Sequence, residues 1–133
     1  SKAGAVTAEL AGERYVFTSA VREKQQEEAA EETQEGEQET YWLLNGEEAE
    51  LGPVLESITS MVPRASAAGM EPSHAQELKI TVSRDNSRFP EVELCFYRNT
   101  AEDCLVTLNG ASTVLVNRAD VSALYEAITK LVL

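Results

Sequence analysis

Apolar and polar residues alternate at the start of the chain, and this alternation predicts a β-hairpin. In the stretch GAVTAELAGERYVFTS, a two-residue loop at Ala11–Gly12 pairs Val6 with Phe17 and Glu9 with Arg14. Apolar side chains and opposite charges then face each other across the hairpin, as paired antiparallel strands favour. The pattern predicts three strands in this region: Gly4–Leu10, Glu13–Ala20 and Thr40–Leu44.

Two later segments carry apolar residues at the spacing of amphipathic helices. Pro53 fits only the first turn of the earlier helix, and Pro63 ends it. In the later helix, Asn117 serves as the N-cap and Asp120 follows three residues on. The apolar stripes are Leu51, Val54, Leu55, Ile58, Met61, Val62 and Val121, Leu124, Tyr125, Ile128, Leu131, Val132. The earlier helix is preceded by Glu47, Glu48 and Glu50, which we expect near its N-terminus, where the helix dipole favours acidic side chains.

The region between the helices reads as a loop over residues 63–76 and then as more strands. Asn109–Gly110, between alternating apolar runs, is the strongest hairpin signal in the chain. Four strands are predicted: Glu77–Arg84, Glu91–Arg98, Asp103–Leu108 and Ala111–Val116. We therefore expect one α+β domain over residues 1–133. Its antiparallel sheet has two helices packed on one face, in the order ββ(β)α–ββββα.

The two helical segments resemble each other at an offset of 70 residues, with ELGPVLESITSMV over DVSALYEAITKLV. Every apolar position coincides, and each helix follows a strand that ends in Asn-Gly. One interpretation is a degenerate duplication of a unit of strands followed by one helix. The other is that any two amphipathic helices share such a stripe, and the sequence leaves both open.

Acidic residues are concentrated in one segment. The chain carries a net charge of −12, and residues 23–40 hold eight glutamates and one lysine. We interpret residues 22–40 as a mobile, solvated loop, because they offer no apolar stripe to bury. The alternative is an arm that binds a cation or a partner. This charge repels phosphate backbones and anionic lipid surfaces, which argues against nucleic-acid binding.

Candidate chemistry is sparse, and we expect no catalytic residues, no cofactor and no metal. Cys95 and Cys104 lie on neighbouring predicted strands. A two-residue loop at Asn99–Thr100 would place Cys95 opposite Cys104, as a disulfide needs, but would pair Phe96 with Asp103. A three-residue loop gives a clean apolar face and puts the cysteines on opposite faces, which favours free thiols. His74, the single histidine, lies in a predicted loop without a motif that frames a nucleophile.

Five residues are candidate partner contacts. Tyr41 and Trp42 are consecutive on a strand, so one of them faces away from the core. Exposed aromatic side chains favour partner binding, although a tryptophan in a small domain is more often core. Arg84, Arg88 and Arg98 are expected to cluster at adjacent turns of one sheet end and to receive the acidic loop of the same or another molecule.

The order of these signals resembles the domain-of-unknown-function families of bacterial cell-surface lipoproteins, which contain repeated α+β units. The segments YWLLNGEEAELGPVLESITSMV, ELKITV and TVLVNRADVSALYEAITKL carry the resemblance, and the glutamate-rich insert departs from it. The resemblance implies a non-enzymatic, extracytoplasmic domain.

The chain begins at SKAGAV without an initiator methionine, so any export signal or lipid anchor is expected upstream. We expect a monomeric or weakly dimeric binding or scaffolding module whose partner is an envelope protein or a cell-wall component. One alternative is an inhibitor or sensor that binds an extracellular enzyme or a cell-wall polymer through the acidic loop. A small enzyme is the least favoured class.

Overall fold

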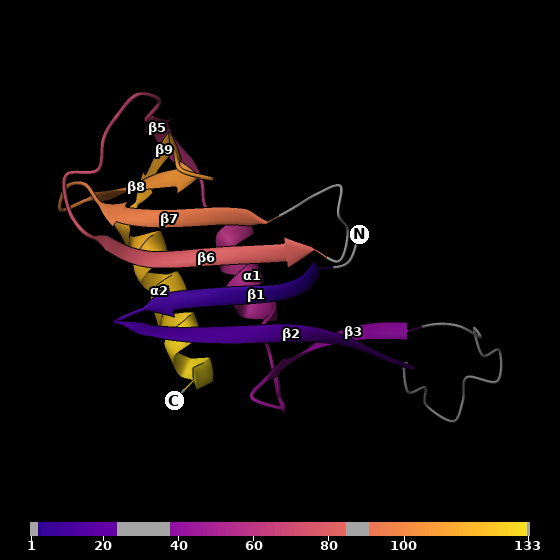
Figure 1. The fold of residues 1–133 in the computed structure, drawn as a ribbon. Coiled ribbons are helices and arrows are strands. Elements are labelled where there is room, and N and C mark those ends of the chain that lie inside the picture. The colour runs from indigo at the N-terminus through magenta and orange to yellow at the C-terminus, as the bar shows by residue number, and fades with distance from the viewer. Residues whose placement is uncertain (1–2, 24–37, 85–90, 133) are drawn as a thin grey trace.

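A large antiparallel sheet and two helices make up the part of the protein that the computed structural model describes, residues 3–23, 38–84 and 91–132 (Figure 1). The first half of the chain contains β1 (Ala3–Leu10), β2 (Glu13–Glu23), β3 (Gln38–Leu44), β4 (Glu47–Ala49) and α1 (Gly52–Thr59). The second contains β5 (Pro63–Ser66), β6 (Gln76–Arg84), β7 (Val92–Arg98), β8 (Asp103–Leu108), β9 (Ala111–Asn117) and α2 (Arg118–Val132). The predicted α+β class is confirmed.

The order of strands across the sheet is β4-β3-β2-β1-β6-β7-β8-β9-β5. Two four-stranded meanders, β1–β4 and β6–β9, thus run outward in opposite directions from the central β1·β6 pair, which is antiparallel. Each meander leads directly into a helix. Only β5 lies outside this mirrored arrangement, at the edge beside β9.

The first hairpin forms in the predicted register. Val6 pairs with Phe17 and Glu9 with Arg14. Ala11 and Gly12 have φ angles of 52° and 78°. A two-residue turn with both central residues in the left-handed region matches the twist of the flanking strands. The hairpin prediction is therefore confirmed in both its turn and its pairing.

Two short strands were not expected, and each corrects a prediction. β4 occupies Glu47–Ala49, where acids were predicted to lie near the start of a helix. The Asn45–Gly46 turn folds the chain back onto β3 instead of simply ending it, and α1 begins only at Gly52 with no acid in its first turn. β5 forms within the predicted loop 63–76 by pairing with β9. The predicted order ββ(β)α–ββββα is therefore short by these two edge strands.

The two helices differ in length, and the shorter one ends before Pro63, the residue predicted to end it. Pro53 lies in the first turn of α1, as predicted, but α1 ends at Thr59 before its stripe is complete. α2 begins directly after Asn117 and carries Asp120 in its first turn. It continues for 15 residues, compared with 8 in α1. Neither helix of the described chain is long and apolar enough to cross a membrane.

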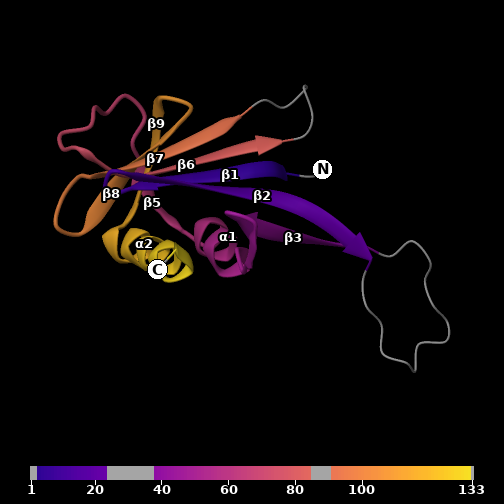
Figure 2. The ribbon, with the colours of Figure 1, turned by 60° about the horizontal axis from the view of Figure 1, so that its bottom comes forward.

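The main core joins both helices to alternate residues of the strands. It includes Val6, Phe17, Ile80 and Phe96 from the sheet, together with buried residues of the helical segments. The latter are Leu51, Val54, Val121, Leu124 and Ile128. Figure 2 shows α1 and α2 next to each other below the sheet. At about 1.5–3 kcal/mol for each large apolar side chain, this burial is the main favourable contribution to folding.

A second, smaller buried layer lies on the other face of the sheet, over β7, β8 and β9. Cys95 and Leu105 alternate with core residues along their strands, yet only 6% and 1% of their surface is exposed. The connection between β5 and β6 lies over this face in Figure 2. It is held there by hydrogen bonds from the Ala67 N–H to the Thr113 carbonyl (2.9 Å) and from the Ser112 hydroxyl to the Met70 carbonyl (2.6 Å).

Both ends of the segment predicted as a mobile loop, residues 22–40, are strand. β2 continues through Arg22 and Glu23, and β3 begins at Gln38, so residues 22–23 and 38–40 are paired strand. Residues 24–37 lie outside the described part of the chain, and the prediction for them stays a prediction.

Candidate functional site

The β2–β3 hairpin extends beyond the rest of the sheet (Figure 1). Within the described residues, the β1–β2 register reaches Thr18, whereas the β2–β3 register continues from Ser19 to Glu23. β4 pairs with Trp42, Leu43 and Leu44 and no further. We call the paired segments 19–23 and 38–42 the ribbon.

The outer edge of the ribbon is open among the described residues. Leu44 and Glu47 flank a two-residue turn, so they form a hydrogen-bonded pair, and so do Trp42 and Ala49. By the same alternation, the N–H and C=O of Thr40 point outward, past the end of β4. Unpaired backbone groups at a strand edge are a template for an added strand.

Arg22 organises the face of the ribbon that points away from the helices. Its Nε lies 2.6 Å from Oε2 of Glu39, and its Nη2 lies 2.9 Å from Oε2 of Glu48. Its guanidinium also stacks over the Tyr41 ring, 4.2 Å from the centroid. Hydrogen bonds to Glu48 and then to Glu39 raise the pKa of Arg22, so its guanidinium stays charged throughout the physiological range.

Tyr41 and Trp42 are placed on opposite faces, as consecutive residues of a strand must be. Tyr41 lies half-buried under Arg22, on the face away from the helices. Trp42 is also half-buried, but it packs against the main core. The prediction that one of the two faces away from the core is confirmed, and Tyr41 is that residue.

The three arginines do not form one cluster, and that prediction is wrong. β6 and β7 are antiparallel, and Val82 pairs with Val92 while Gln76 pairs with Tyr97. Arg84 and Arg98, the last residues of β6 and β7, therefore lie at opposite ends of this strand pair. Arg88 lies outside the described residues.

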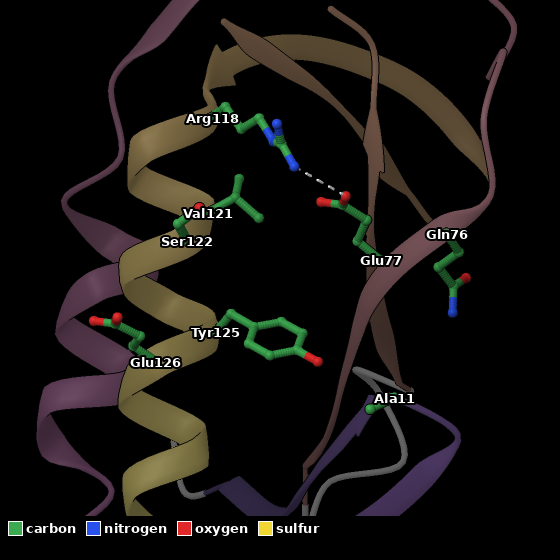
Figure 3. Close-up of a pocket in the computed structure, with 8 residues that line it drawn as sticks. All are labelled: Ala11, Gln76, Glu77, Arg118, Val121, Ser122, Tyr125 and Glu126. Atoms are coloured by element: carbon green, nitrogen blue, oxygen red, sulfur yellow. Dashed lines mark ion pairs between the residues drawn. The ribbon is translucent and has the colours of Figure 1, made fainter. Parts of the chain in front are cut away.

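A cavity of about 500 Å³ lies between α2 and the sheet, beside the turn that joins β1 to β2 (Figure 3). Its walls include Ala11, Glu77, Arg118, Val121 and Tyr125. In Figure 3, Arg118, Val121 and Tyr125 project from one face of α2 toward the strands, and Glu77 reaches toward Arg118 from β6. The Nη2 of Arg118 lies 3.6 Å from Oε2 of Glu77.

The two cysteines are buried, whereas the single histidine is exposed. Cys95 and Cys104 are free, buried and on opposite faces of the sheet, as predicted. The pairing of Arg98 with Cys104 shows that the connection is longer than the three-residue loop considered for this register. Burial raises the pKa of the Cys104 thiol to about 11, which keeps it protonated at neutral pH. His74 is exposed, and its Nδ1 lies 3.0 Å from the Ser73 hydroxyl.

Within residues 3–23, 38–84 and 91–132, no group of three or more histidine, cysteine or acidic side chains is arranged to hold a metal ion. The chain matches no protein-family model, no curated protein and no solved structure in the comparisons made.

Sequence reasoning missed four residues of these sites: Arg22, Tyr125, Arg118 and Glu77. Arg22 was assigned to the mobile loop, although extending the β2–β3 register would have paired it with Glu39. Tyr125 was counted as part of an apolar stripe, because its spacing along α2 gives no sign that it borders a cavity. Arg118 is separated from Glu77 by forty residues of chain, and no local pattern connects them.

Proposed function

We propose that this domain is a non-catalytic protein-binding module and that it binds a basic, extended segment of its partner along the open edge of β3. The observation that carries the proposal is the ribbon, which leaves the backbone of Thr40 unpaired on its outer side among the described residues. An extended segment added there continues the sheet, and its main-chain hydrogen bonds supply affinity.

Charge complementarity determines the kind of partner. The ribbon and β4 carry an excess of acids around a single arginine, and Arg22 is already paired with Glu39 and Glu48. The acids of the ribbon and β4 are Glu23, Glu39, Glu47 and Glu48, and Glu50 directly follows β4. A partner strand with lysine or arginine on its exposed face is attracted and oriented by this field, whereas an acidic strand is repelled.

A binding role is favoured over a catalytic one by the placement of the reactive groups. His74 is exposed on a connection, while both thiols are buried away from solvent. Catalytic sites typically hold an exposed nucleophile, an adjacent base and a third group that orients the base. The exposed Ser73 hydroxyl lies 3.0 Å from Nδ1 of His74, but among the described residues no third group is hydrogen-bonded to the His74 ring. Tyr41, on the exposed face of the ribbon, is the aromatic residue best placed to contact the side chains of an added strand.

The two halves of the sheet, each with its helix, resemble each other in arrangement. We infer that α1 and α2 together cover one face of the sheet and that the halves β1–β4–α1 and β6–β9–α2 are degenerate copies of one unit. The mirrored strand order supports this, as do the equivalent hairpins with Asn45–Gly46 and Asn109–Gly110 turns before each helix.

The location of the domain is part of the same proposal. We propose an extracytoplasmic protein held at the cell envelope, acting as a monomer or weak dimer, on the basis of the resemblance to lipoprotein domains. The N-terminal identity of the mature protein, isolated from separated membrane and soluble fractions of its own cells, tests this. A diacylated cysteine upstream of Ser1 supports it, and an unmodified protein in the cytosol contradicts it.

The binding proposal is tested with a defined peptide of alternating lysine and valine, followed by the fluorescence of Trp42, the single tryptophan. A peptide of equal charge with proline in place of valine is the probe control, because proline lacks the N–H groups needed for strand pairing. We expect the valine peptide to bind at least tenfold more tightly than the proline peptide, and to weaken as salt screens the charges.

Two substitutions at one position separate strand addition from simple charge attraction. Thr40→Pro removes the outward N–H and is expected to abolish the preference for the valine peptide. Thr40→Val keeps the backbone and is the matched control, with affinity unchanged within about twofold. Equal binding of both peptides to the unaltered protein would overturn strand addition.

A further inference from the structure

The cavity between α2 and β6 presents one positive and one negative side chain that face each other (Figure 3). Their 3.6 Å separation is longer than the 2.7–2.9 Å of a charge-assisted hydrogen bond. About a third of each side chain is exposed, 35% for Arg118 and 33% for Glu77. Each group therefore keeps the capacity to bind an opposite charge from outside.

The floor of the cavity is apolar. Val121 is 2% exposed, and the half-buried ring of Tyr125 extends from the same helix face one turn further on. Arg118, Val121 and Tyr125 are spaced i, i+3 and i+7, so they form a continuous strip along α2. A ligand held between the two charges would contact this strip with its uncharged part.

We propose that this cavity binds a free α-amino acid with an apolar side chain. The carboxylate of the ligand pairs with Arg118, its ammonium group pairs with Glu77, and its side chain packs against Val121 and Tyr125. A simple anion would lie beside Glu77 without a partner for that carboxylate, and a simple cation would lie beside Arg118. A zwitterion satisfies both charges and replaces one long ion pair with two short ones.

The size and composition of the cavity agree with a small ligand. Its volume of about 500 Å³ falls in the range of small-molecule sites, which combine an apolar lining with a few placed polar groups. The site is separate from the ribbon. It is formed by α2, β6 and the β1–β2 turn, whereas the ribbon belongs to the far parts of β2 and β3.

The first test changes the ligand and leaves the protein intact. Leucine and phenylalanine are titrated into the full chain by two-dimensional NMR, beside their N-acetyl and carboxamide derivatives. We expect the free amino acids to shift the amide signals of Glu77, Arg118 and Val121, and each derivative to bind at least tenfold more weakly. Equal binding of the derivatives, or no shift with the free amino acids at 10 mM, overturns the proposal.

The second test changes one charge at a time. Arg118→Gln and Glu77→Gln are each expected to weaken leucine binding at least tenfold. Glu126→Gln is the matched control, because Glu126 also borders the cavity but its carboxylate points away in Figure 3. Its affinity for leucine is expected to stay within twofold. A loss in the control as large as in Glu77→Gln overturns the specific role of the Arg118 and Glu77 pair.

Discussion

The two halves of the sheet share an arrangement but are covered differently. In the second half, the helix-facing core lies on one side and the β5–β6 connection lies on the other, so Leu105 and Cys95 are buried on the outer face. In the first half, the outer face of β2 is open, and Val16 is 41% exposed. One half is thus covered on both faces and the other on only one.

The two edge strands of the sheet, β5 and β4, also differ in how much of their neighbouring strand they cover. β5 pairs along the outer side of β9, and it is short and begins with Pro63, which are features that block further strand addition. β4 covers only three residues of β3. We therefore expect the second half to contribute more to stability. In the first half, a partner can reach both a sheet face and a strand edge.

The largest expected effects compare the same substitution in the cores of the two halves. Leu124→Ala, in the middle of α2, is expected to lower the free energy of unfolding by about 3–5 kcal/mol, because the packed surroundings cannot collapse. Leu51→Ala, at the start of the short α1, is expected to cost about 2–3 kcal/mol. Urea unfolding of both variants measures this. A larger loss for Leu51→Ala would reverse the assignment of stability.

On the outer faces of the two halves, replacing a leucine with alanine is expected to have unequal effects. Leu105→Ala on β8 is expected to cost about 2–4 kcal/mol, because Leu105 is 1% exposed. Leu43→Ala, on the outer face of β3, is expected to cost about 1 kcal/mol, since Leu43 is only half-buried. Equal losses in denaturant unfolding would mean that the outer face of the first half is as well covered as that of the second.

The thiol of Cys104 gives a pH-dependent measure of burial in the second half. Its folded pKa of about 11 lies above its ordinary value of 9.0, so folding favours the protonated form. The corresponding stability is complete below pH 9 and is lost as the pH rises through about 11. Other groups titrate in this range too. Between pH 9 and about 11, the unfolding free energy is therefore expected to fall less in Cys104→Ala than in the unaltered protein. An identical pH profile for the two proteins would contradict a contribution from this buried thiol.

The smallest effects concern the two equivalent turns. Gly46 and Gly110 have φ angles of 84° and 88°, where a side chain is strained. Gly110→Ala is expected to cost about 1–2 kcal/mol, because it strains the long β8–β9 hairpin. Gly46→Ala is expected to cost under about 0.5 kcal/mol and to speed hydrogen exchange in β4, because three-residue β4 can fray alone. Equal losses would show that β4 is a firm part of the fold.

Much of the fold could be predicted because its signals are local. The alternation around Ala11–Gly12 fixed the first hairpin register, and the apolar face shared by Phe96 and Val106 placed the cysteines on opposite faces. β4 and β5 were missed because edge strands this short carry no pattern of their own. They form because β3 and β9 offer them backbone partners.

The sequence by itself determined the α+β class, most of the strands, both helices and the concentration of acid near the β2–β3 connection, since each follows from periodicity or composition within a short window. Only the tertiary structure decided which residues meet. It stacked Arg22 on Tyr41, brought Arg118 opposite Glu77, and separated Arg84 from Arg98. These contacts depend on how β2 and β3 extend, how α2 crosses the sheet and which way β7 runs, and no local pattern encodes such long-range geometry.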